Sequence, residues 1–316
     1  MPWQNFIPTV EAKKLLKERD KYLILAAHCT REYEGQVRKA GDRVRIVGIG
    51  SPTIYTLDKD GKYQANEVGP GSIAGTGKQV IQGGIPSAEN IEDTEVEIQI
   101  NRMAVWNFGM GDVDAALMGG AKGKMAKLRQ KQGKLLAEIH DKYIAKIMAG
   151  FTPCKFKETG GKRSDGVYYI KNGAEVTDTA TAAINPCDLV DNIVQKLNEQ
   201  DIPDSEQLVL ECSPKFWKLL KKEYRDLDTN NSAMLAGRKC GEYNDIKVFK
   251  TNNTVVDGKE YIFVRTLDSV AFIDPHTKTK CYEPESGFAE AVKGWNLYDS
   301  AIIDPKGLIS VEVKYA

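Results

Sequence analysis

The sequence predicts an α+β fold in which one very long helix stands between an extended arm and an α/β domain. Three observations predict this fold. Residues 112 to 149 contain no proline and have an amphipathic pattern, which predicts a helix of about 38 residues and on the order of 57 Å. Residues 50 to 92 are rich in glycine and proline. From residue 186 onward, short apolar strands alternate with amphipathic helices, a pattern typical of α/β architecture.

The chain begins with a predicted helix and a predicted strand. Leucine and isoleucine recur at helical spacing between residues 9 and 27, which predicts a helix there. After the turn residues Gly41 and Asp42, apolar and basic residues alternate from Arg43 to Ile49. This alternation predicts a β-strand that buries one of its faces.

Residues 50 to 92 differ in kind from the segments on either side. They hold eight glycines and three prolines and lack the periodicity of a core element. So long a segment without a core is unusual inside a compact domain. It is either disordered or an extended arm that packs on a surface outside its own domain. In the second interpretation, the contact is made by the apolar residues Tyr55, Leu57, Tyr63, Val68, Ile73, Val80 and Ile81.

The long predicted helix follows a predicted strand at residues 95 to 100, and its two faces differ. We expect an apolar face, directed to the core, that consists of Met125, Leu128, Leu135, Leu136, Ile139 and Tyr143. The opposite face carries Lys124, Lys127, Lys131 and Lys134. Such charge is typical of a solvated face. It also suits a surface near phosphates, which attract lysine without any reading of sequence.

The second half of the chain predicts a hairpin and then the α/β domain. The strand-like residues 167 to 170 precede Asn172-Gly173, a strong signal for a hairpin turn. Two helices are predicted at residues 186–199 and 214–224. Strands are predicted at residues 207–210, 246–249, 261–264, 270–273 and 308–313.

Composition argues against several functions. Lys plus Arg and Asp plus Glu number 44 each, whereas a dedicated DNA-binding protein is markedly basic. The sequence has no stretch of about 18 apolar residues that would span a membrane, and its start lacks the apolar core of a signal peptide. The six cysteines are far apart and form no CxxC pair. Their spacing indicates neither a zinc site nor a redox motif, and we expect free thiols.

Motifs that would indicate catalysis are incomplete, so we expect no catalytic, cofactor or metal site. The segment from Ser72 to Gln79 lacks the first glycine and the final hydroxyl residue of a phosphate-binding loop. His28 and Cys29 are neighbours in sequence, and neighbours on a helix do not face each other. A distant base, His140 or His276, would still permit nucleophilic catalysis. A soluble cysteine-dependent hydrolase therefore stays as an alternative function.

In the order of its elements, the chain resembles the major capsid protein of tailed bacteriophages, whose fold was first seen in the Hong Kong phage. The resemblance rests on the Gly-Asp-x-Val strand that starts at Gly41 and on the Gly/Pro-rich loop that follows it. Residues 106 to 112, which lead into the long helix, and residues 287 to 294 with Tyr298 near the end also match. Many relatives have glycine after that tyrosine, whereas this chain has Asp299.

The resemblance implies the phage major capsid fold, with an N-terminal arm, an extended β-hairpin loop, a long spine helix in a peripheral domain, and an α/β axial domain. The implied boundaries are an arm at 1–40, a peripheral domain at 41–49 and 93–153 with a spine helix at about 112–149, an extended loop at 50–92, a small hairpin insertion at 154–185, an axial domain at 186–280 and a closing segment at 281–316 that returns to the peripheral and axial domains.

The resemblance also implies a structural protein, not an enzyme, that self-assembles into the icosahedral or prolate head shell around phage double-stranded DNA. It implies no cofactor and no membrane, and a place in the virion after assembly in the host cytoplasm. The implied partners are further copies of the chain in hexamers and pentamers, portal and scaffolding proteins, in some relatives a decoration protein, and packaged DNA through non-specific contact. Because the first predicted helix begins within ten residues of Met1, we expect a separate scaffolding protein or unaided assembly. An encapsulin-like nanocompartment shell, which shares the fold, is the alternative within the structural class.

Overall fold

The computed structural model describes fourteen segments of the chain, residues 8–33, 43–49, 55–57, 63–65, 80–81, 93–111, 121–156, 167–171, 183–200, 202, 206–226, 240–243, 246–283 and 289–315. The chain divides into two compact units. The larger unit is Met1–Asp42 with Gln99–Ala316, and the smaller is Arg43–Ile98.

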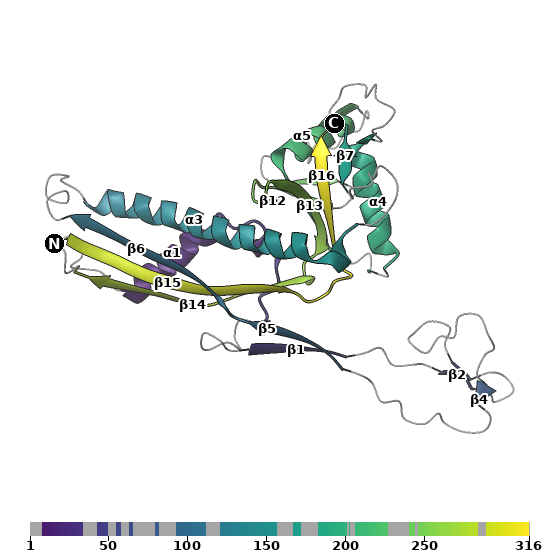
Figure 1. Ribbon diagram of the computed structural model, residues 1–316, viewed down its shortest axis with the longest axis horizontal. Coiled ribbons are helices and arrows are strands. Elements are labelled where there is room, and N and C mark those ends of the chain that lie inside the picture. The colour runs from purple at the N-terminus through teal and green to yellow at the C-terminus, as the bar shows by residue number, and fades with distance from the viewer. Residues whose placement is uncertain are drawn as a thin grey trace. The chain divides into compact units, whose positions relative to one another are not determined.

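One part of the larger unit is a three-stranded antiparallel sheet accompanied by a long helix (Figure 1). The elements are β6 (Arg102–Gly111), β14 (Val270–Tyr282), β15 (Ala289–Ile302), α1 (Pro8–Asp20), the short 3-10 helix η1 (Ala26–His28) and α3 (Ala121–Gly150). The strand order is β14-β15-β6, and β15 pairs with β6 from Tyr298 opposite Arg102 to Ala289 opposite Gly111. Helix α3 runs along the sheet, and α1 lies against α3 and β14.

The other part of the larger unit is a mixed sheet covered by α4 and α5 (Figure 1). Its elements are β7 (Tyr168–Ile170), β8 (Ala183–Ile184), α4 (Pro186–Asn198), β9 (Leu208–Cys212), α5 (Pro214–Asp226), β10 (Cys240–Tyr243), β11 (Ile246–Lys250), β12 (Val255–Val256), β13 (Lys259–Thr266) and β16 (Leu308–Tyr315). The strand order is β10-β11-β9-β13-β16-β7-β8, and β12 pairs with β13. A short 3-10 helix, η3 (Thr152–Cys154), follows α3.

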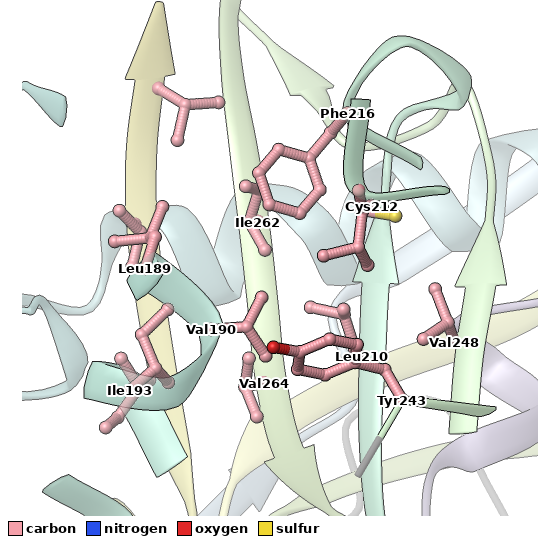
Figure 2. Packing of buried hydrophobic residues seen from close by; sticks show 14 of the residues in the cluster. Leu189, Val190, Ile193, Leu210, Cys212, Phe216, Tyr243, Val248, Ile262 and Val264 are labelled. Atoms are coloured by element: carbon pink, nitrogen blue, oxygen red, sulfur yellow. The ribbon is translucent and has the colours of Figure 1, made fainter. Parts of the chain in front are cut away.

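The core of this mixed sheet lies between its strands and the two helices (Figure 2). Leu189, Val190 and Ile193 of α4 have no exposed surface, as their helical spacing in the sequence predicts. Phe216 of α5 points into the same core beside Cys212 and Ile262. Each such large side chain stabilises the fold by about 1.5–3 kcal/mol when it leaves water. The expected α/β texture after residue 186 is therefore present in the structure.

The smaller unit consists of short strands. Strands β1 (Arg43–Ile49) and β5 (Asp93–Gln99) form a two-stranded sheet. Strands β2 (Tyr55–Leu57), β3 (Tyr63–Ala65) and β4 (Val80–Ile81) form a separate antiparallel sheet in the order β2-β3-β4. The expected extended loop at 50–92 thus contains β-structure, and its remaining residues lie outside the described part of the chain.

The hairpin expected within 154–185 is described only in part. Strand β7 pairs in parallel with β16 on one side and in parallel with β8 on the other. The turn expected at Asn172-Gly173 and the strand expected after it lie outside the described residues.

The domain boundary expected at residue 280 needs correction. Strand β14 begins at Val270, inside the range assigned to the axial domain, yet it pairs with β15 along most of its length. It belongs to the sheet beside α3. In contrast, β16 comes from the closing segment and pairs with β13 in the mixed sheet. The chain therefore runs from β13 in the mixed sheet into the sheet beside α3 and then back to the mixed sheet at β16.

The face of α3 that meets the core differs from the predicted one. Leu136 is buried and Leu128 and Tyr143 are half-buried, but Leu135 is 61% exposed and Ile139 is 45% exposed. The side chain of Met125 lies outside the described residues. The buried face consists of Leu136, Ala137, His140, Asp141, Ile144, Ala145, Met148 and Ala149. The prediction for Leu135 and Ile139 failed because His140 and Asp141, two polar residues, occupy core positions through specific partners.

Gly133 allows α1 to pack closely against α3. A Cβ atom added at Gly133 would lie 2.9 Å from the backbone nitrogen of Arg19 and 3.1 Å from the carbonyl carbon of Glu18. Helix α1 therefore approaches α3 more closely than any side chain at position 133 permits. A glycine inside a helix costs about 1 kcal/mol relative to alanine, but at position 133 it makes room for α1.

Adjacent leucines on α3 give a matched test of its orientation. We expect Leu136→Ala to lower the free energy of unfolding by about 2–5 kcal/mol, because Leu136 is buried and its loss leaves a cavity. Leu135→Ala should change it by no more than about 0.5 kcal/mol. Urea unfolding of the unassembled subunit measures both. Equal losses would show that the helix is turned differently from the structure.

Candidate functional site

The smaller unit contains most of the residues expected to make contacts outside their own domain. Tyr55 and Leu57 lie on β2, Tyr63 on β3, and Val80 and Ile81 on β4. Val68 and Ile73 lie outside the described residues. The register places Leu57 opposite Tyr63, and Tyr63 opposite Ile81. Sheets with strands this short are marginally stable in water by themselves, so packing on a further surface would stabilise this one.

Two elements of the larger unit each expose a pair of large apolar side chains. On β6, Met103 is 56% exposed and Val105 is 66% exposed, and a spacing of two puts both on one face of the strand. On α3, Leu135 and Ile139 are one helical turn apart and share a face. Single exposed apolar residues are ordinary. Two pairs on regular elements form surfaces that another protein chain can cover.

The lysines expected on the outer face of α3 are where the sequence places them. Lys127, Lys131 and Lys134 are exposed, and the side chain of Lys124 lies outside the described residues. Farther along the helix, Lys142 pairs with Glu138 at 2.6 Å, and this pair lowers the pKa of Glu138. The positive charge of α3 is therefore partly neutralised beyond Lys134.

A buried ion pair between two neighbouring strands of the mixed sheet, β9 and β13, was not predicted from the sequence. Arg265 of β13 and Glu211 of β9 have fully buried side chains. The Arg265 Nη2 and Nε atoms donate to the two carboxylate oxygens of Glu211 at 2.9 and 3.1 Å. The same guanidinium donates to the backbone carbonyl oxygens of Leu25 at 2.8 Å and His28 at 3.0 Å. The pair thus binds the chain segment that follows α1.

Burial and pairing act in opposite directions on Glu211. Desolvation by burial raises its pKa, but the nearby charge of Arg265 and the hydrogen bond with His28 outweigh burial and hold the pKa below its usual range. His28 Nδ1 lies 3.0 Å from Glu211 Oε1. The glutamate is therefore ionised, and its carboxylate binds two side chains from distant parts of the chain, His28 and Arg265.

Asp141 of α3 binds backbone N–H groups of the same segment, whereas Arg265 binds its carbonyl groups. Its carboxylate accepts hydrogen bonds from the backbone N–H groups of Ile24 and Ala26, each at 3.1 Å, and from the amide of Asn253 at 3.3 Å. Desolvation by burial outweighs these bonds and raises the pKa of Asp141 to about 6. Together with Arg265, Asp141 anchors the backbone of residues 24 to 28.

The raised pKa of Asp141 predicts a pH dependence of stability. A carboxyl group whose pKa is higher in the folded state than in the unfolded state binds more protons when folded, so its contribution to stability falls as pH rises from about 4 to about 6. We expect the unfolding free energy of the wild type, relative to Asp141→Asn, to fall by about 2–3 kcal/mol across this window. Unfolding of both proteins in urea at several pH values measures it. Parallel pH profiles would contradict the assignment.

A second polar cluster binds the end of α1 to the sheet. Arg19 is buried and contacts the carboxylate of Asp274 on β14. The Asn296 amide donates to Asp274 and to Thr277, and its oxygen lies 2.9 Å from His140 Nε2. Burial lowers the pKa of His140 to about 3, so the ring is neutral and its Nε2–H donates to Asn296.

The geometry at Cys29 disfavours the hydrolase alternative. Its thiol donates to the carbonyl oxygen of Leu25 at 3.3 Å and accepts from Arg265 at 3.4 Å. Burial raises the pKa of the Cys29 thiol, whereas a cysteine nucleophile needs a lowered pKa and an exposed position. His28 is engaged with Glu211. Cys29 and His28 thus form part of the contacts that hold the segment after α1 in place.

Within the described residues, no group of three or more histidine, cysteine or acidic side chains is arranged to hold a metal ion. Over the same residues, no helix is both long and apolar enough to cross a membrane. The described residues contain buried polar groups that hold the larger unit together, and exposed apolar and basic side chains on its surface.

Comparison with known proteins identifies the fold. No protein-family model and no curated protein sequence matches the chain. Among solved structures, it is similar to one from Mycobacterium phage Che8, with 17% identity, a TM-score of 0.61 and coverage of 92% of this chain and 90% of that one. It is also similar to the capsid of cyanophage P-SCSP1u, with 15% identity, a TM-score of 0.57 and coverage of 88% and 85%. The mature capsid of bacteriophage PhiM1 matches with 13% identity, a TM-score of 0.56 and coverage of 86% and 82%. The chain therefore has the fold of tailed-phage capsid proteins.

Proposed function

We propose that this chain is the major capsid protein of a tailed bacteriophage, and that it self-assembles into the head shell. The observation that carries the proposal is the shared fold, which extends over most of this chain and most of the capsid chains it resembles. The surfaces support it. In the smaller unit, the sheet of β2, β3 and β4 has strands of only two or three residues, and the larger unit exposes apolar pairs on β6 and α3.

A closed shell gives each of these surfaces a partner. Rotational symmetry presents the same patch on every copy, so contacts between unlike surfaces close into rings. We propose hexamers and pentamers of this chain, in which β2, β3 and β4 pack on a neighbouring copy. Portal and scaffolding proteins, and a decoration protein, are further proposed partners. The virion is the proposed location, after assembly in the host cytoplasm.

The contents of the shell are proposed to be double-stranded DNA held by non-specific contact. Lys127, Lys131 and Lys134 of α3 are exposed, and lysines attract phosphates independently of sequence. These residues, with Lys124, are one proposed DNA-facing surface. No feature of the described residues requires a cofactor.

Sedimentation of the chain expressed alone tests the proposal. We expect uniform, fast-sedimenting particles, because the surfaces that remain open in the single chain are covered in a shell. Ultraviolet absorbance of the particle fraction separates two structural functions. Nuclease-resistant nucleic acid in the particles supports a phage shell, whereas particles that contain protein cargo and no nucleic acid indicate an encapsulin-like compartment. A chain that sediments only as a monomer or small oligomer, also when a scaffolding protein is expressed with it, contradicts both.

A further inference from the structure

A row of lysines lies on the outer face of α5. Phe216, Leu219 and Leu220 turn towards the core of the mixed sheet and are buried, and Phe216 is seen there in Figure 2. Lys215, Lys218 and Lys222 occupy the opposite side and are exposed. At about 100° per residue, these three lysines fall within roughly 60° of one another. They span about 10 Å along the helix axis.

Aromatic rings contact one lysine of this row and two lysines beside it. Lys250 of β11 lies over the Trp217 ring with its Nζ atom 4.2 Å from the ring centroid, and Lys221 lies 5.0 Å from the same centroid. Lys215 lies 3.7 Å from the centre of the Tyr315 ring. Attraction between a cation and a ring face restrains the long side chain. The ammonium groups of Lys215, Lys221 and Lys250 are therefore held in place before any ligand arrives.

Among the described residues, no carboxylate neutralises the charge of this row. Within the described part of the chain, Lys215, Lys218, Lys222 and Lys250 form no ion pair with a carboxylate. Nearby, Glu260 accepts hydrogen bonds from Ser213 and Tyr315. Helix α4, which covers the same sheet, differs, because its Lys196 pairs with Glu199 at 2.9 Å. An unneutralised row is a surface for an anionic partner.

We propose that Lys215, Lys218, Lys221, Lys222 and Lys250 around Trp217, the α5 lysine surface, bind the phosphate backbone of double-stranded DNA. The inference rests on the proposed function, a shell around DNA, and assigns a second surface to that contact besides α3. Duplex DNA presents one negative charge per about 1.7 Å of its axis, so a row of about 10 Å meets several phosphates. Lysine binds phosphate as a point charge. The contact therefore positions DNA and reads no base.

Salt dependence of DNA binding measures the contact. The full chain, unassembled, is titrated against a fluorescent duplex of random sequence between about 50 and 200 mM salt. The test variant is Lys215→Gln, Lys218→Gln, Lys222→Gln. The matched control is Lys13→Gln, Lys14→Gln, Lys17→Gln, which removes the same charge from the exposed side of another helix, α1. Circular dichroism checks that both variants fold, and electron microscopy of the same proteins under assembly conditions scores particles.

Each outcome decides. We expect the test variant to reduce the slope of log affinity against log salt by about 2.7, with affinity about tenfold or more lower at the lower salt, because each lost phosphate contact removes about 0.9 from the slope. The α1 variant should reduce it much less. An unchanged slope, or equal reductions in both variants, overturns the inference. Tighter binding of a polyglutamate peptide than of DNA, lost in the same test variant, assigns the surface to an acidic protein and also overturns it.

Particle formation separates this inference from the proposed function. Wild type and both variants should assemble alike, because the substituted lysines are exposed and carry no part of the core. If particles form and the slope is unchanged, only the α5 lysine surface is wrong. If the wild type forms no particles, also in the presence of a scaffolding protein, the proposed function fails whatever its affinity for DNA.

Discussion

Substitution of Arg265 by alanine is expected to destabilise the subunit by about 3–5 kcal/mol, because it leaves the fully buried Glu211 without its partner. It also frees the carbonyl oxygens of Leu25 and His28, which the guanidinium binds at 2.8 and 3.0 Å. A buried polar group without a partner costs stability of its own. Urea unfolding of the unassembled subunit should show the loss as a lower midpoint with an unchanged slope.

An exposed ion pair gives the control for this prediction. Lys142 and Glu138 pair on the surface of α3, with side chains 56% and 38% exposed. Lys142→Ala should lower the free energy of unfolding by no more than about 1 kcal/mol, since water screens such pairs. In a third variant, Arg265→Met with Glu211→Met, the uncompensated charge is removed, and part of the lost stability should return. A loss for Arg265→Ala as small as that for Lys142→Ala would contradict the anchoring role.

Replacement of residues 60 to 82 by a short turn is expected to abolish stable particles while the larger unit stays folded. The segment includes β3 and β4, and its ordering costs about 1–2 kcal/mol of backbone entropy per residue. Its few apolar residues can offset that cost only through burial against other copies of the chain. Size-exclusion chromatography and electron microscopy should show a soluble subunit and no closed shells.

Point substitutions test the same segment with less disturbance. Leu57, Tyr63 and Ile81 lie opposite one another in the β2-β3-β4 register, and their joint replacement by serine should also prevent assembly. The matched control replaces Thr56 and Gln64, which pair in the same sheet, by serine and should assemble normally. Normal shells from the first variant would refute the role of these apolar residues. Protection of this segment from hydrogen exchange in the monomer would refute it as well.

Amphipathic helices with purely apolar inner faces were predictable from the sequence. The helix expected at 186–199 is α4, Pro186–Asn198, and its inner face is buried as its spacing indicates. Helix α3 shows where such reasoning stops. Its inner face includes His140 and Asp141, whose burial depends on Asn296 and on the backbone of residues 24 and 26. Those partners are distant in sequence, so they cannot be identified from the spacing of apolar residues. That spacing therefore predicted that Leu135 is buried, whereas it is exposed.

The buried ion pair had a weak signal in the sequence. Arg265 ends an apolar run that starts at Tyr261, and Glu211 follows another at 208–210. A charged residue inside a strand that is otherwise apolar points to a buried partner of opposite sign, because a lone buried charge is too costly. The sequence does not say which charges pair, since β9 and β13 are brought together only by the sheet. The parallel pairing of β7 with β16 could not be predicted for the same reason.

Electron cryomicroscopy of particles assembled from the wild-type chain is the most direct test that this chain forms a shell. We expect a closed shell of pentamers and hexamers in which β2, β3 and β4 of each subunit contact a neighbouring copy, and in which Met103, Val105, Leu135 and Ile139 lose exposure. A chain that stays monomeric at high concentration, also with a scaffolding protein, would contradict this expectation. So would a shell in which residues 55–57, 63–65 and 80–81 pack only on their own subunit.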